Sequence, residues 1–135
     1  MVELKLVIAE PKSGKCKQVQ LNEEQSKALF GKKIGETFKG EVIDMTGYEF
    51  EITGGSDFCG FAMRKDLPGT QRKRILAVKG VGIKPGRDGE RKRKNVAGNT
   101  IFEKTAQINM KVVKAGKEDL FAEPAPAEAE APAAE

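Results

Sequence analysis

The sequence of 135 residues contains no histidine. The commonest general base and the usual zinc ligand are therefore missing, and neither a Ser-His nor a Cys-His catalytic arrangement can form. Cysteine is also scarce. Cys16 and Cys59 are the only two, and their wide separation does not match a metal-binding spacing. These absences predict a protein that is not an enzyme, takes no small-molecule substrate and holds no metal and no cofactor.

Long apolar runs are absent as well. None approaches the ~20 residues that a membrane-spanning helix needs. The first residues also lack the charged and apolar regions of a secretory signal. We therefore expect a cytoplasmic protein with reduced thiols and no membrane partner.

Basic residues are present in number but unevenly distributed. The chain has 24 lysines and arginines against 20 acidic residues, and twelve of the basic residues lie between Arg64 and Lys94. Only Asp66, Asp88 and Glu90 are acidic in these 31 residues, which therefore carry a net charge of +9. A nucleic acid is the expected partner, because its phosphates release counterions when lysine and arginine neutralise them. The alternative is a solvated charged face, which the length of the segment makes less favoured.

The basic segment is also rich in glycine. Nine of the 15 glycines lie in it or beside it. Such a sequence has little apolar surface to bury, so we predict that residues 64–98 form a basic, Gly-rich extension that becomes fully ordered only against a partner. RNA is favoured over a membrane, because the segment lacks the apolar helical face that binds a membrane surface. The cations at 91–94 are the densest and are expected to bind phosphates, which positions RNA without reading its sequence. The predicted RNA-binding residues are Arg64, Lys65, Arg72, Lys73, Arg74, Lys79, Lys84, Arg87, Arg91, Lys92, Arg93 and Lys94.

Alternating apolar residues predict short strands through much of the remaining chain. Residues 2–8 and 16–21 alternate on either side of a turn at 12–15 and predict a hairpin. Residues 22–25 resemble a capping box and predict one short helix over 26–30 that ends at Gly31. Further strands are expected at 37–43, with a bulge at Gly40, and around 48–52, 74–78 and 108–112. Together these elements predict a mainly β fold, a small partly closed β-barrel of about six short strands with one short helix.

The end of the chain differs in composition. Residues 121–135 contain seven alanines, four glutamates and three prolines, too little apolar bulk to offset the entropy of the chain. We therefore predict one β domain over residues 1–118, which includes the RNA-binding segment 64–98. A disordered acidic Ala/Pro/Glu tail is predicted over residues 119–135.

A glycine-rich stretch after the strand at 48–52 predicts a structural turn formed by Gly54, Gly55, Asp57 and Gly60. The paired glycines are expected to supply backbone angles closed to other residues, and Asp57 to make a turn hydrogen bond or a salt bridge. Phe58 and Phe61 beside this turn have two interpretations. They could stack on RNA bases, or they could pack in the core or the turn, and packing is favoured.

Residues 52–63, ITGGSDFCGFAM, resemble the signature of small-subunit ribosomal protein six of the archaeal and eukaryotic type. In that signature, Gly-Gly-x-Asp-x-x-Gly-x-Pro-Met follows an apolar and a small residue, and Ala62 stands where the family usually has proline. Residues 89–98, GERKRKNVAG, are similar to a second block of the family, with Asn95 in place of a serine. The resemblance extends over roughly residues 1–118.

This resemblance implies a structural constituent of the small ribosomal subunit, in contact with ribosomal RNA and neighbouring ribosomal proteins in the cytoplasm, that catalyses no reaction. After Lys117 the sequence turns acidic and has no serine or threonine, so it resembles the short archaeal form without the phosphorylated basic helix of eukaryotic members. Two alternatives remain open. A free RNA-binding translation regulator would have the same basic segment, whereas an RNA-modifying enzyme would need an acid-base or metal group that this sequence does not supply.

Overall fold

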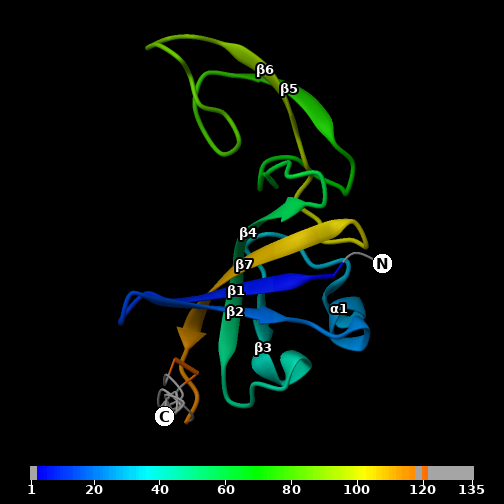
Figure 1. The fold of residues 1–135 in the computed structure, drawn as a ribbon, viewed down its shortest axis with the longest axis vertical. Helices are drawn as coiled ribbons and strands as arrows, with labels where there is room; N and C mark the ends of the chain where they lie inside the picture. Colours follow the sequence, from blue (N-terminus) through cyan, green and yellow to red (C-terminus); the bar gives the residue numbers. More distant parts are fainter. Residues whose placement is uncertain (1–2, 118–119, 122–135) are drawn as a thin grey trace, which may run out of the picture.

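The computed structural model describes residues 3–117 and 120–121 of the chain. In this part the protein is mainly β with one α-helix, which confirms the predicted class. Five strands form one sheet in the spatial order β2-β1-β7-β4-β3, and two others form a separate hairpin (Figure 1). The strands are β1 (Lys5–Glu10), β2 (Lys15–Gln20), β3 (Thr37–Lys39), β4 (Glu49–Asp57), β5 (Lys73–Ala77), β6 (Lys92–Val96) and β7 (Thr105–Lys114), and the helices are α1 (Glu23–Leu29) and the 3-10 helix η1 (Gly40–Ile43).

The first two strands form the predicted hairpin. They pair antiparallel, from Lys5 opposite Gln20 to Glu10 opposite Lys15. The Gly14 N–H donates to the Glu10 carbonyl (2.9 Å) and closes the turn. Gly14 has a φ of +71°, a conformation that glycine adopts without steric cost.

β7 is the central strand of the sheet and lies between β1 and β4. It pairs in parallel with β1 and antiparallel with β4. This register places Leu6 beside Ile108 and Ile8 beside Met110, and all four side chains are buried in one core with Phe50. A parallel pair cannot be joined by a tight turn, and here most of the chain lies between β1 and β7.

The predicted helix is present as α1. The Asn22 N–H donates to the Gln25 Oε1 atom (3.2 Å), one of the bonds of a capping box. Leu29 at the other end is buried in the core. The Gln25 side chain also donates to the Asp44 carboxylate (2.5 Å), which fixes α1 against the end of η1.

Residues 37–43 do not form the single bulged strand that the sequence predicts. β3 ends at Lys39, and Gly40 begins η1. The Gly40 N–H donates to the Tyr48 carbonyl (2.8 Å) and its carbonyl accepts from the Met45 N–H (2.9 Å), which turns the chain sharply. A Cβ atom at Gly40 would lie 2.1 Å from the Met45 carbonyl oxygen. Glycine therefore permits a tight turn here, not a bulge, and the prediction of one strand over 37–43 is wrong.

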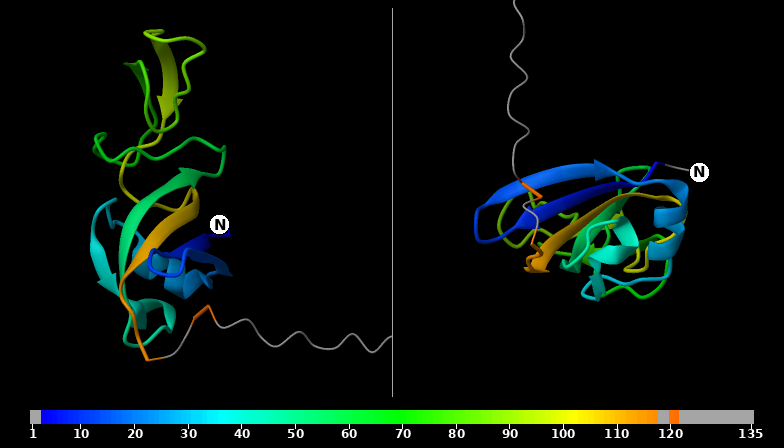
Figure 2. Two further views of the ribbon diagram at one scale, coloured as in Figure 1. Left: turned by 90° about the vertical axis from the view of Figure 1, so that its left-hand side faces the viewer. Right: turned by 90° about the horizontal axis from the view of Figure 1, so that it is seen from below.

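The predicted closure into a barrel is not confirmed. β2 and β3 are the two edges of the sheet in the described part of the chain. Closure requires the edge strands to pair, whereas the described pairing of β3 is with β4. The sheet is twisted, as Figure 2 shows, but it remains open.

The packing of Leu120 and Phe121 differs from the prediction of a disordered tail that begins at residue 119. Both side chains are half-buried and pack against the hydrophobic core. The Lys17 ammonium also donates to the Leu120 carbonyl (3.0 Å). The rest of the predicted tail, residues 122–135, lies outside the described residues. Among the residues that the structure does describe, no helix is long and apolar enough to cross a membrane.

Candidate nucleic-acid interface

β5 and β6 form an antiparallel hairpin that stands away from the sheet at one end of the molecule (Figures 1 and 2). We call residues 73–96 the arm. Residues opposite one another in an antiparallel pair share a face, so Arg74 and Arg93 lie on one face of the arm and Lys92 and Lys94 on the other. Both faces therefore carry positive charge. The cross-strand pairs are Lys73–Val96, Arg74–Asn95, Ile75–Lys94, Leu76–Arg93 and Ala77–Lys92.

The base of the arm is fixed to the sheet domain. Val96 is fully buried, and the N–H of the next residue, Ala97, donates to the Ala62 carbonyl (2.9 Å). Beyond it, Gly98 packs directly on the backbone of Gly69. A Cβ atom at Gly98 would lie 1.9 Å from the Gly69 carbonyl oxygen, so glycine at position 98 permits this close approach.

The turn that joins β4 to this region is built by Asp57 and Gly60. We call residues 57–61 the signature turn. Asp57 is 3% exposed, and its Oδ1 atom accepts from the Phe58 N–H (2.6 Å). The Gly60 N–H donates to the Asp57 carbonyl (2.9 Å), and Gly60 has a φ of +84°. Carboxylate, backbone and glycine together hold the turn.

Gly54 and Gly55 lie in β4 and not in the turn that the sequence predicts. Neither has a positive φ, so the expected special backbone angles are absent at both. A Cβ atom at Gly55 would lie 2.4 Å from the Gln107 carbonyl oxygen of β7, whereas one at Gly54 would have no atom within 4 Å. Glycine at position 55 therefore permits the close approach of β7. β4 continues through both glycines to Asp57 and stays paired with β7.

Arg72 is held by contacts within the protein. Its Nε atom donates to the Asp57 Oδ2 atom (2.6 Å), which is the shortest of the described ion pairs. Its guanidinium carbon lies 5.1 Å from the centre of the Phe58 ring and 4.9 Å from that of the Phe61 ring. The hydrogen bond to Asp57 is the main cause that raises the pKa of Arg72. Arg72 thus organises the signature turn, although the sequence places it among the RNA-binding cations.

Arg64 is also engaged. It donates two hydrogen bonds to the Asp66 carboxylate, both 2.9 Å, and one to the Val81 carbonyl in the arm (3.2 Å). These bonds hold the pKa of the Asp66 carboxyl below its usual range and raise the pKa of Arg64. Arg64 therefore ties the loop of the arm to the sheet domain.

A weaker contact engages Lys92. Its Nζ atom lies 3.5 Å from the Glu90 Oε2 atom. The same carboxylate accepts from the Gly86 N–H (2.5 Å), and this backbone hydrogen bond is the main cause that lowers the pKa of Glu90. Glu90 thus closes the loop between β5 and β6.

The other nine predicted cations are exposed, and within the described residues none of them has a carboxylate at salt-bridge distance. Their charges are available to a partner. Most lie in the arm, which also exposes three large apolar side chains, Leu76, Val78 and Val81. The nine cations are Lys65, Lys73, Arg74, Lys79, Lys84, Arg87, Arg91, Arg93 and Lys94.

An open groove of about 590 Å³ lies between the arm and the signature turn. We call it the arm groove. Arg74, Arg93 and Lys94 line its arm side together with Asn95, and Phe61 lines the opposite side. Arg74 and Arg93 share one face of the arm, and their charges in the lining of a groove of this volume suit the phosphates of an extended nucleic-acid backbone.

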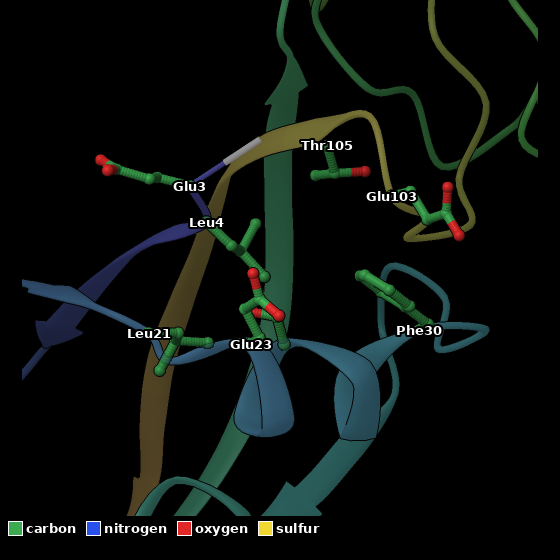
Figure 3. Close-up of a pocket in the computed structure, with 8 residues that line it drawn as sticks. Glu3, Leu4, Leu21, Glu23, Phe30, Glu103 and Thr105 are labelled. Carbon is green, nitrogen blue, oxygen red and sulfur yellow. The ribbon is translucent and has the colours of Figure 1, made fainter. Parts of the chain in front are cut away.

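A smaller cavity of about 80 Å³ lies beside α1, between the starts of β1 and β7 (Figure 3). Leu4 and Phe30 contribute apolar walls, and Glu3, Glu23 and Glu103 are also among the lining residues. Its volume is below the roughly 300 Å³ at which small-molecule sites begin, and its charge repels phosphate. In the described part of the chain, no group of three or more His, Cys, Asp or Glu side chains is placed to hold a metal ion.

The sequence analysis missed Phe102 and Lys104, which lie beside the signature turn. The Phe58 N–H donates to the Lys104 carbonyl (2.9 Å), and both missed residues line a pocket with Phe58. No local pattern marks them, because only the pairing of β4 with β7 brings residues 102–105 to the turn.

Comparisons with known proteins show the family to which the chain is similar. Residues 4–122 match the family model described as ribosomal protein S6e. The chain is 46% identical over 120 residues to small ribosomal subunit protein eS6 of Methanocaldococcus jannaschii, with 89% of each chain covered. It is 44% identical over 124 residues to the protein of the same name from Archaeoglobus fulgidus, with 89% of this chain and 96% of the relative covered. The corresponding protein of Methanothermobacter thermautotrophicus is 45% identical over 116 residues, with 86% and 90% covered.

Proposed function

Because the chain belongs to the ribosomal protein S6e family, we propose that it is a structural constituent of the small ribosomal subunit and that the arm binds ribosomal RNA. The family is one of structural proteins and not of enzymes. The archaeal relatives carry the small ribosomal subunit in their names and match nearly the whole chain. Neighbouring ribosomal proteins are the other expected partners.

The observation that supports the proposal is the set of nine exposed cations that have no carboxylate at salt-bridge distance within the described residues, most of them in the arm. A hairpin of two strands buries little surface and is marginally stable alone. The arm is nevertheless fixed at its base and extends away from the sheet domain (Figure 1). The cations of the arm then bind phosphates, while the sheet domain holds the base of the arm and fixes its orientation.

Replacement of the cations that line the arm groove tests directly whether the arm binds RNA. The variant Arg74→Gln/Arg93→Gln/Lys94→Gln removes three of them, and none of these side chains is buried. The matched control Lys5→Gln/Lys12→Gln/Lys15→Gln removes three exposed charges from the β1–β2 hairpin. Binding to a transcript of the small-subunit ribosomal RNA is expected to weaken in the groove variant and to stay near wild type in the control. Equal losses in both would show that only net charge matters and would contradict a role for the arm.

Sedimentation of the tagged protein in its own cells tests the ribosomal role against that of a free RNA-binding regulator. The proposal predicts that the protein migrates with small subunits and with whole ribosomes. A pool that remains mainly at the top of the gradient, separate from subunits, would support the free regulator instead.

A further inference from the structure

A second pocket lies on the other side of the signature turn from the arm groove. Its volume is about 330 Å³. The rings of Phe58 and Phe102 contribute apolar surface, Thr70 and Gln71 contribute polar groups, and Arg72 and Lys104 contribute positive charge. The signature turn separates the two sites, because Phe61 lines the groove and Phe58 lines this pocket.

Phe58 is exposed but held in place. The residue is 49% exposed, although its backbone N–H is fixed by two acceptors, the Asp57 carboxylate and the Lys104 carbonyl. The Arg72 guanidinium supports the ring from one side, at 5.1 Å from its centre. A large aromatic surface that is both preorganised and open to solvent is suited to stacking on a planar ligand.

The polar groups around this ring are available. Within the described residues, no hydrogen bond engages the Thr70 hydroxyl, the Gln71 amide or the Lys104 ammonium. A hydroxyl and an amide can bond the edge of a base, and an ammonium can bind its phosphate. The charge of Arg72 is balanced by Asp57, so Arg72 supports stacking and leaves the phosphate to Lys104.

We propose that this pocket takes one unpaired nucleobase of ribosomal RNA, stacked on Phe58. The proposal rests on the function proposed above and adds that the bound RNA includes a single-stranded nucleotide beside the segment held in the arm groove. An unpaired base is favoured over a paired one, because a paired base presents only its edge and cannot lay its face on Phe58. It is favoured over an apolar side chain of a protein, because cations lie both in the pocket and along the adjoining groove.

The test compares two RNA probes with three proteins. The probes are a 12-nucleotide single strand of mixed sequence and a 12-base-pair RNA duplex. The proteins are wild type, Phe58→Tyr, which keeps a ring for stacking, and Phe58→Leu, which keeps an apolar side chain without a ring. Phe58→Leu should weaken binding of the single strand by about 5- to 150-fold, the range for loss of one stacked base. Affinity for the duplex should remain unchanged, and Phe58→Tyr should bind both probes like wild type.

Each other outcome has a distinct meaning. Equal binding of the single strand by Phe58→Leu and wild type would overturn the pocket and leave the arm assignment intact. A loss of assembly with neighbouring ribosomal proteins, at unchanged affinity for the single strand, would show that the pocket takes a protein side chain and would also overturn the proposal. Failure of wild type to bind either probe or the full ribosomal RNA would instead contradict the function proposed for the arm. If Phe58→Leu binds both probes more weakly, a second measurement uses a fluorescent base analogue in the single strand bound to wild type. A change in emission that shows stacking supports the pocket, and unchanged emission overturns it.

Discussion

At the scale of single residues, internal carboxylates divide the cations of the basic segment into two groups. Asp57 and Asp66 hold Arg72 and Arg64, each through a direct hydrogen bond between the side chains. A cation paired in this way gains little from binding a phosphate, because it would first have to leave its carboxylate. These arginines therefore shape the fold around the signature turn, and the RNA contacts proposed above fall to the neighbouring cations that have no ion pair among the described residues.

Gly55 provides a prediction about close packing. Gly55→Val should lower the free energy of unfolding by about 1–3 kcal/mol, the usual cost of overpacking, because a Cβ atom would lie 2.4 Å from the Gln107 carbonyl oxygen. Gly54→Ala is the matched control and should change stability by no more than about 0.5 kcal/mol, since no atom lies within 4 Å of its Cβ position. Denaturant titration measures both. Similar losses in the two variants would show that β7 does not approach Gly55 as described.

Asp66 provides a prediction about pH. Arg64 lowers the pKa of Asp66 in the folded protein below the unfolded value of about 3.9. The folded state therefore favours the ionised carboxylate. Its contribution to stability is complete well above the unfolded pKa and is lost as the pH falls through the lower pKa of the folded protein. The stability difference between wild type and Asp66→Asn should accordingly be larger at pH 7 than at pH 3. Denaturant titration at the two pH values measures it.

The control for this pH effect is Asp88→Asn, at an exposed aspartate that has no ion pair among the described residues. It should show a smaller change between the two pH values. A stability difference for Asp66→Asn that does not depend on pH would mean that the Arg64 bond contributes nothing to folding.

At the scale of secondary-structure elements, the sequence predicts those with regular apolar alternation. β1, α1, β4 and β7 are all found close to their predicted positions, because their buried residues repeat at strand or helix spacing. β2 is also found where it was predicted, although its residues are exposed except for the half-buried Val19, because the turn after β1 returns the chain along that strand. β6 was missed as a strand. Its sequence KRKNV has one buried residue, Val96, and its pairing depends on β5 rather than on a pattern of its own. η1 was missed for a similar reason, since the turn at Gly40 depends on contacts with Met45 and Tyr48 that lie further along the chain.

The candidate site shows the same limit. Composition alone locates the basic segment, because charge is a property of the sequence. It does not show that Arg72 pairs with Asp57 or that Arg64 bonds the Val81 carbonyl in the arm, because these partners are distant in the sequence and meet only in the fold. Lys104 lies ten residues beyond the basic segment and is brought to the signature turn by the end of β4.

The end of the described chain provides a prediction about an element. Truncation after Phe121 should change the free energy of unfolding by no more than about 0.5 kcal/mol, since the composition of residues 122–135 predicts little burial. Leu120→Ala/Phe121→Ala in the full chain should cost about 1–3 kcal/mol, roughly half the value for two fully buried side chains, because both are half-buried against the core. Chemical denaturation separates the two effects. A double variant as stable as wild type would place the boundary before residue 120, as the sequence suggested.

At the scale of the whole molecule, the fold separates two functions. The five-stranded sheet contains the hydrophobic core, and the arm beyond it carries eight of the nine exposed cations of the basic segment that have no ion pair among the described residues. Three glutamates line the small cavity beside α1 (Figure 3), whereas residues 64–94 carry a net charge of +9. This arrangement would orient the protein on a polyanion before any close contact forms.

The most direct measurement of the central claim is the salt dependence of RNA binding by the variant with Arg91, Lys92, Arg93 and Lys94 all replaced by glutamine. Each phosphate contact contributes roughly 0.7–0.9 to the slope of log affinity against log salt. Lys92 is already near Glu90, so three to four contacts are lost and the slope should fall by about 2 to 3.6, with the thermal transition of the sheet domain nearly unchanged. A variant that assembles into small subunits and binds ribosomal RNA with the wild-type slope would contradict the account, and the RNA contact would then have to lie outside β6.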